Sequence, residues 1–174
     1  MLGLAMSHFP DLDAIPELIR RGRVSASSEN PYDHREGLHY PLVLVSLGVL
    51  AMIVVPYWGH MFLVATLLHL VNDFYGTGWG IKLLWPISNS NYKLLGRRVN
   101  RLKYLLADSW SDLPDSEKKL RLVVSWDRRE LPDYIEKWGM DYWIEQYYLK
   151  LNWICVTEYV LFAVAVVLSV YSLI

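Results

Sequence analysis

Cysteine is almost missing from this chain, and that scarcity excludes two classes of small protein. Cys155 is the only cysteine among 174 residues, so it has no partner for a disulfide within the chain. A disulfide-stapled secreted domain and a cysteine-rich zinc module are therefore both excluded. A metal ion, if the protein binds one, must be held by histidine and carboxylate side chains.

An excess of positive charge is also lacking. The sequence holds 17 Lys and Arg against 18 Asp and Glu, a formal net charge of −1. A protein that neutralises nucleic-acid phosphates needs a basic surface, so we expect no nucleic-acid partner. Charge of either sign is scarce, at 20% of residues, whereas 53% are hydrophobic, and this balance is apolar for a soluble domain.

The apolar residues gather in three stretches with hardly any charge. Residues 40–58 contain no Asp, Glu, Lys or Arg, and as a helix at ~1.5 Å per residue they would extend about 28 Å, close to the hydrocarbon thickness of a bilayer. Residues 60–75 are apolar apart from a few polar side chains, and 151–174 contain a single charged residue. We therefore predict an all-α, multi-pass helical membrane protein with about three spans plus interfacial and cytoplasmic helices.

The basic residues predict how such a protein is oriented. All of them fall within 20–35 or 82–150, and the positive-inside rule assigns these segments to the cytoplasmic side of the inner or plasma membrane. Three parts follow from this topology. Residues 1–90 form a membrane-embedded metal-site region, 91–150 a cytoplasmic amphipathic helical segment, and 151–174 a C-terminal transmembrane helix.

Two pairs of polar residues precede the first predicted span. Asp11 and Asp13 flank one leucine, so an extended backbone lets both carboxylates converge on one ion. The alternative is that Asp13 caps a helix over 14–21. His34 and His39 lie close before the span, and imidazole is a common ligand of zinc-like ions. Alternatively, the two histidines belong to a solvated loop at the membrane interface and bind no metal.

A third pair lies inside the second predicted span. His69 and Asp73 are four residues apart and therefore share one helix face. Ionisable residues inside a span mark a functional site by default, although a histidine–aspartate hydrogen bond can also simply tie helices together. Because this helix runs toward the cytoplasmic face, we expect the pair to meet His34, His39 and the two aspartates there, with Glu158 as a further partner.

These motifs stand in a characteristic order along the first half of the chain. The segments are Pro-Asp-Leu-Asp at 10–13, the two-histidine segment at 34–39, His-Leu-Val-Asn-Asp at 69–73, and the run from Gly78 through Leu-Leu-Trp-Pro to Ser88. This order resembles the YdjM-like family of membrane-bound metal-dependent hydrolases. The resemblance implies a multi-pass membrane protein, a bound metal ion and hydrolytic chemistry.

From the residues and the resemblance we predict a membrane-bound metal-dependent hydrolase that acts on an ester or phosphoester at the cytoplasmic membrane face. The predicted metal ligands are His34, His39, His69 and Asp73, and the predicted catalytic residues are Asp11 and Asp13, each as ligand or general base. The cofactor is a divalent ion, zinc first, with manganese or iron as alternatives. The expected partners are the lipid bilayer and a lipid or phosphate-bearing substrate. Arg35 or the arginines of 97–101 would hold the phosphate of such a substrate. An oligomer is also possible.

Two other functions compete with this prediction. The first is a non-catalytic integral membrane protein whose polar residues fasten helices and whose cytoplasmic segment, 82–150, recruits a partner. The second is an ion or metal transporter. Three spans leave little room for a transport pathway unless the protein forms oligomers. Metal content separates the hydrolase from the non-catalytic protein, and substrate turnover separates it from the transporter.

Overall fold

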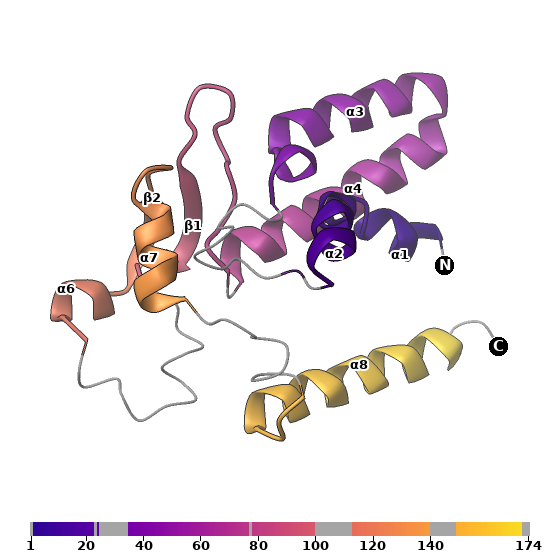
Figure 1. Cartoon of the computed structure of the whole chain (residues 1–174). Coiled ribbons are helices and arrows are strands. Elements are labelled where there is room, and N and C mark those ends of the chain that lie inside the picture. The colour runs from indigo at the N-terminus through magenta and orange to yellow at the C-terminus, as the bar shows by residue number, and fades with distance from the viewer. Residues whose placement is uncertain are drawn as a thin grey trace. The chain divides into compact units, whose positions relative to one another are not determined.

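The structure, a computed structural model, describes residues 2–22, 24, 35–76, 78–99, 113–139 and 149–171. The chain forms two compact units, Met1–Met140 and Asp141–Ile174. The helices and 3-10 turns of the first unit (Figure 1) are α1 (Leu2–Ser7), η1 (Pro10–Ala14), α2 (Ile15–Arg21), η2 (Gly37–His39), α3 (Pro41–Val54), α4 (Pro56–Tyr75), α6 (Asp115–Lys118) and α7 (Leu131–Trp138). Its strands are β1 (Asn91–Gly96) and β2 (Arg121–Trp126), and the second unit contains α8 (Trp153–Tyr171).

Prolines determine where the two longest helices of the first unit begin. Pro41 opens α3 and Pro56 opens α4, each in the first turn, where the missing backbone N–H leaves no hydrogen bond unmade. Pro56 therefore divides the apolar stretch 40–58 between two helices. With 14 residues, α3 is about 21 Å long at ~1.5 Å per residue, well short of a ~30 Å hydrocarbon core. The predicted first span is wrong for this reason.

The prediction of an all-α multi-pass membrane fold is also wrong for the chain as a whole. Within the described ranges, no helix combines the length and the apolar sequence needed to cross a membrane. Although α4 has 20 residues, polar side chains interrupt its sequence, namely His60, Thr66, His69, Asn72 and Asp73. The same ranges contain seven α-helices together with a two-stranded antiparallel sheet, so the fold is not all-α.

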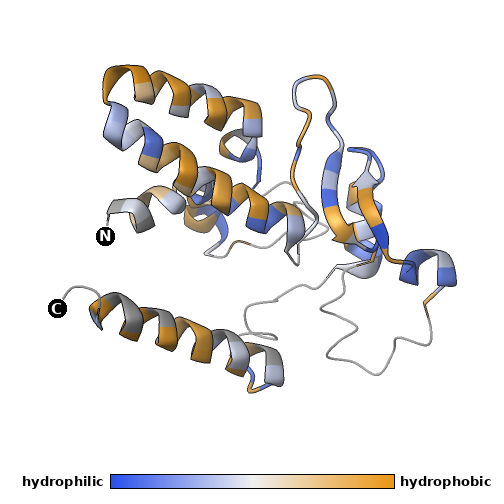
Figure 2. Ribbon diagram, turned by 180° about the vertical axis from the view of Figure 1, so that it is seen from behind, coloured by the Kyte–Doolittle hydropathy of each residue, from blue (hydrophilic) through white to orange (hydrophobic). Residues whose placement is uncertain are grey.

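The helices α3 and α4 pack closely against each other. A Cβ atom at Gly59 would collide with the backbone of Met52, and one at Gly48 would press against Leu63, so the two glycines permit this approach. Apolar residues make up most of α3 and much of α4 (Figure 2), and many of them are exposed. Their exposed side chains include Leu42, Leu47, Leu50, Ile53, Val64, Leu68 and Val71. An exposed apolar surface of this kind is typical of proteins that contact lipid or another protein.

The segment predicted as a cytoplasmic amphipathic helix contains the sheet instead. Asn91 of β1 lies opposite Trp126 of β2, and Leu94 lies opposite Val123. Over residues 91–94 of β1, buried and half-buried positions alternate, which is the two-residue period of a strand rather than the period of a helix. The sheet and α7 enclose a core formed by Trp79, Val124, Trp126, Leu131 and Ile135.

The second unit is described from residue 149 to residue 171 and contains α8. Asn152 caps this helix, because its Oδ1 accepts the backbone N–H of Cys155 at 3.0 Å, a bond typical of asparagine at a helix start. Cys155 is buried against this turn. Most of the described side chains along α8 are apolar and exposed within the unit, among them Leu161, Phe162 and Val167.

Candidate metal centre

Two aspartates enter the candidate site from η1, a 3-10 turn that begins with Pro10. At about three residues per turn, Asp11 and Asp13 point to different sides, unlike two residues of the extended segment considered from the sequence. Asp11 turns its Oδ1 toward two histidines, while Asp13 places Oδ2 2.8 Å from Nδ1 of His39. Asp13 does not cap the following helix, since the N-cap of α2 is Ala14 and has no side-chain capping bond.

Two of the three predicted histidine ligands face each other. His39 ends η2 and is fully buried, whereas His69 lies on α4, about two turns before its end. Their Nε2 atoms are 3.4 Å apart. Ring nitrogens at this separation share a proton or face a common cation. His34, the third histidine, lies outside the described residues.

Asp73 brings a fourth donor atom, one turn after His69 on α4. Its Oδ2 lies 3.2 Å from Nε2 of both His39 and His69. Oδ1 of Asp11 is 3.7 Å from Nε2 of His39 and 3.4 Å from Nε2 of His69. A tetrahedral ion with bonds of about 2.0–2.1 Å holds its ligand atoms about 3.3–3.4 Å apart. The ligand atoms of Asp11, His39 and His69 all lie within 4.8 Å of one another, as the ligands of a small divalent metal ion do, and Oδ2 of Asp73 approaches the same two imidazole nitrogens.

Two hydrogen bonds hold these donors in place, one from Arg35 to Asp73 and one between Asp13 and His39. Arg35 donates a hydrogen bond from its guanidinium to Oδ1 of Asp73 at 2.6 Å, so that Oδ2 remains directed at the histidines. Gly78 makes room for Arg35, since a Cβ atom there would collide with the guanidinium. Asp13 holds the far side of the His39 ring. A carboxylate on the outer nitrogen of an imidazole is the usual support of a metal-binding histidine.

The fit of a metal ion can be tested on Asp73 and on the charge of the site. Oδ2 of Asp73 is buried, and no described group makes a well-aligned hydrogen bond to it, although Nε2 of His39 and Nε2 of His69 each lie 3.2 Å away. Leaving a buried carboxylate oxygen unsatisfied is costly, and a cation among the four donors would satisfy it. Asp11, Asp13 and Asp73 together with Arg35 leave an excess of two negative charges when both imidazoles are neutral. A divalent cation offsets this excess.

Without an ion, the same charges shift the pKa values of the donors. Burial lowers the pKa of His39, but the close carboxylates of Asp11, Asp13 and Asp73 outweigh it and raise the value to about 10. Burial likewise lowers the pKa of His69, and bonds to Asp11 and Asp73 raise it to about 9. Burial raises the pKa values of Asp11 and Asp73, yet the histidines hold both well below their usual range. Metal binding at neutral pH must therefore displace protons from the imidazoles.

A second polar group joins the segment that carries His39 to the segment after Gly80. Glu36 accepts a hydrogen bond from the hydroxyl of Tyr40 at 2.5 Å and pairs with the ammonium of Lys82. Lys82 is only 1% exposed, and Tyr40 stacks on Trp85 with ring centroids 4.6 Å apart. Trp85 of the Leu-Trp-Pro run therefore packs on the residue that follows His39. Nothing in the sequence indicated the Glu36–Lys82 pair.

Other predicted participants are not brought to this centre. Arg98 pairs with Glu130 at 2.7 Å and lies over the ring of Tyr134, so it is engaged beside α7. Arg101 lies outside the described residues, and so does the side chain of Glu158 on α8.

The chain matches a family model over nearly its whole length. The model described as YdjM inner membrane protein matches residues 1–172, nearly the whole chain, whereas the motifs seen in the sequence covered its first half. The searches of curated proteins and of solved structures returned no match. The match agrees with the predicted family and with the predicted location in the inner membrane, and its description names no reaction.

Proposed function

Because the chain belongs to the YdjM family of inner membrane proteins, we propose that it is a membrane-associated, metal-dependent hydrolase of esters or phosphoesters. The observation that carries the proposal is that Asp11, His39 and His69 bring ligand atoms within 4.8 Å of one another. Oδ2 of Asp73 lies 3.2 Å from Nε2 of both histidines. A donor set of imidazole and carboxylate groups suits zinc, with manganese and iron as the next choices.

When bound, a divalent ion would lower the pKa of a coordinated water and polarise the ester or phosphoryl oxygen. The residues around it prepare this chemistry. Asp13 accepts the Nδ1 proton of His39, so that Nε2 presents its lone pair to the centre. Arg35 binds one oxygen of Asp73 and keeps the other directed inward. We assign both Asp13 and Arg35 as positioning residues.

Asp11 has a different role in the proposal. Its side chain is 44% exposed, whereas that of His39 is fully buried and that of Asp73 is 10% exposed. A substrate therefore approaches from the side of Asp11. Oδ1 of Asp11 belongs to the donor set, and Oδ2 lies on the outer side, 3.4 Å from His8. We assign Oδ2 of Asp11 as the acceptor of the proton that the attacking water loses.

A non-catalytic function is favoured by one property of the same donor set. Four protein ligands fill a tetrahedral shell, as in structural sites, whereas catalytic zinc usually keeps one position for water. In that case the ion would only fasten η1 and η2 to α4. This is the metal-bound form of the helix-fastening alternative.

Elemental analysis of the detergent-purified full chain tests the metal site. We expect about one divalent ion per chain and loss of the ion in His39→Ala and His69→Ala. His60→Ala is the matched control, because His60 is also a histidine of α4 but is exposed and contacts the carbonyl of Pro56 at 2.6 Å. A wild-type protein without metal would overturn the proposed site. Stoichiometric metal without turnover of p-nitrophenyl esters or phosphates would overturn the hydrolase and support the structural ion.

A further inference from the structure

The turn formed by residues 35–39, which ends at the buried His39, has an unusual backbone. Arg35 has a φ of 65° and Gly37 a φ of 50°, so the chain enters the left-handed region twice within three residues. Glycine adopts this region freely, whereas an arginine there is uncommon. Residues other than glycine keep such a conformation only where the surrounding structure enforces it, and they gather at functional sites. Contacts from outside the turn must therefore hold it.

Glu36, between these two residues, joins the turn to the segment after α4. Its carboxylate pairs with the ammonium of Lys82 and accepts a hydrogen bond from the hydroxyl of Tyr40 at 2.5 Å. The side chain of Lys82 is 1% exposed. A charge buried this deeply is costly unless it is paired. The ammonium therefore restricts where the carboxylate of Glu36 can lie, and with it the middle of the turn.

The segment 78–82 contacts the turn at two consecutive residues. Gly78 lies against Arg35, since a Cβ atom at Gly78 would collide with the guanidinium. Four residues later, Lys82 pairs with Glu36. Because these two contacts hold neighbouring residues of the turn, they set the direction of the backbone that leads to the buried histidine of η2.

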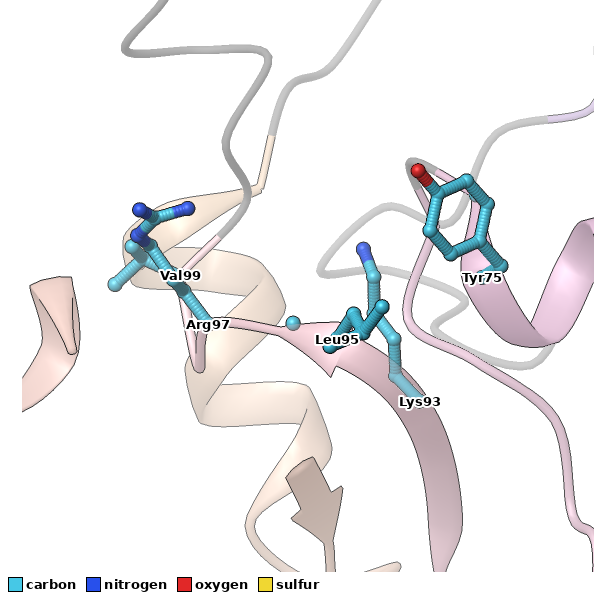
Figure 3. Close-up of a pocket in the computed structure, with 7 residues that line it drawn as sticks. Tyr75, Lys93, Leu95, Arg97 and Val99 are labelled. Atoms are coloured by element: carbon cyan, nitrogen blue, oxygen red, sulfur yellow. The ribbon is translucent and has the colours of Figure 1, made fainter. Parts of the chain in front are cut away.

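Strand β1 holds the segment 78–82 in turn. The backbones of Ile81 and Tyr92 exchange two hydrogen bonds, at 3.0 and 2.8 Å. The ammonium of Lys93 donates to the carbonyl of Gly78 at 3.0 Å. Figure 3 shows Lys93 on this strand, across from Tyr75, the last residue of α4. The segment that contacts the turn is thus fixed to the sheet at both of its ends.

We propose that Glu36 and Lys82 are positioning residues of the metal centre, and that their ion pair holds the turn in the conformation that presents Arg35 and His39 to the donor set. The inference rests on the proposed function and extends it to residues behind the donors. Arg35 bonds Oδ1 of Asp73, and Nε2 of His39 lies 3.2 Å from Oδ2 of the same carboxylate. A shift of the turn would disturb both contacts at once.

A double variant separates positioning from stability. Lys82→Met alone leaves the carboxylate of Glu36 without its cation, and a lone charge of this kind destabilises a fold whatever its function. Lys82→Met combined with Glu36→Gln removes both charges and keeps side chains of similar length. We expect the midpoint of denaturant unfolding to stay near that of wild type, whereas zinc affinity in a chelator competition falls by about tenfold or more. Lys119→Met, at an exposed lysine, is the control and should bind zinc as wild type does.

Gly37→Ala tests the same turn through its backbone. Nothing lies within 4 Å of the position of a Cβ atom at Gly37, so alanine adds only the cost of the left-handed conformation. We expect zinc affinity to fall by about five- to thirtyfold. Gly22→Ala is the matched control, because Gly22 has a φ of 68° and equally open space but ends α2. If the double variant does not fold, this pair of glycine variants decides.

Amide hydrogen exchange on the metal-free, detergent-purified chain gives a measurement that needs no ion. The N–H groups of His39 and Tyr40 donate to the carbonyls of Glu36 and Gly37 at 3.2 and 3.3 Å. In the double variant we expect both to exchange at least about tenfold faster than in wild type, while the amides of β2 keep their rates. Unchanged exchange in the turn would overturn the proposal.

Metal content of the wild type separates the two proposals. A wild type that holds no metal refutes the proposed function, and the exchange rates then decide whether the ion pair holds the turn. A wild type that binds zinc, with the same affinity in the double variant and in Gly37→Ala, supports the metal centre and overturns the positioning role of Glu36 and Lys82.

Discussion

Asp13→Asn is the most informative single substitution, because it changes one charge and leaves the four donor atoms intact. The carboxylate of Asp13 lies 2.8 Å from Nδ1 of the fully buried His39 and is itself 13% exposed. An amide has the same size but is a weaker, uncharged acceptor, so it holds the imidazole less firmly and makes Nε2 less basic.

The expected magnitude follows from the position of Asp13 behind a single ligand. Loss of such a supporting partner weakens metal affinity by about 10- to 100-fold, or about 1.4–2.7 kcal/mol. Competition between the detergent-purified protein and a fluorescent zinc chelator measures the affinity directly. Asp133→Asn is the matched control, since Asp133 is an exposed aspartate in the first turn of α7.

Two results would refute this reasoning. Zinc affinity equal to that of wild type would mean that Asp13 does not orient His39 for metal binding. A loss as large as that of His69→Ala would mean that Asp13 binds the ion directly, as the sequence alone allowed. An intermediate loss, with the control unchanged, is the expected result.

Three further substitutions test other parts of the structure. Gly78→Ala should displace the guanidinium of Arg35 from Asp73 and weaken zinc affinity by up to about tenfold; an affinity equal to that of wild type in the chelator competition would contradict this role. Leu131→Ala removes a side chain that is 1% exposed and should cost about 2–5 kcal/mol in the free energy of unfolding, measured by denaturant titration, while metal content is retained. Gly59→Val should force α3 from α4 and destabilise the protein by about 1–3 kcal/mol; an unchanged melting temperature would show that this contact is not close.

The donor residues were predictable because each is unusual in its surroundings. His69 and Asp73 are ionisable residues in a largely apolar helix, and their spacing fixes them on one face. In the structure, Nε2 of His69 lies 3.2 Å from Oδ2 of Asp73. His39 and Asp11 stand in short polar turns beside apolar stretches. The role of these residues as metal ligands stays a prediction that elemental analysis decides.

The fold was less predictable, because hydropathy records side chains and not backbone constraints. The stretch 40–58 is free of charge, yet Pro56 divides it between α3 and α4. The residues of β1 fit a helix or a strand equally well over so short a run, and pairing with β2 decides the outcome.

Contacts between distant residues were beyond the reach of the sequence. Arg35 and Asp73 are 38 positions apart, and Glu36 and Lys82 are 46 positions apart. A single sequence contains no signal that predicts a contact between two such distant residues. For the same reason, the sequence could not assign Asp11 to the donor set and Asp13 to its support.

The order of the donors along the chain bears on how the protein is made. All four candidate donors lie at or before Asp73, whereas β1, β2 and α7 come later. Because a protein leaves the ribosome from its N-terminus, the complete donor set emerges before the sheet is synthesised. An ion that binds only the folded arrangement stabilises it by about 2.7 kcal/mol at a hundred times its dissociation constant. An ion captured at that stage would assist assembly of the nascent chain, so metal starvation would reduce the amount of protein that matures as well as its turnover.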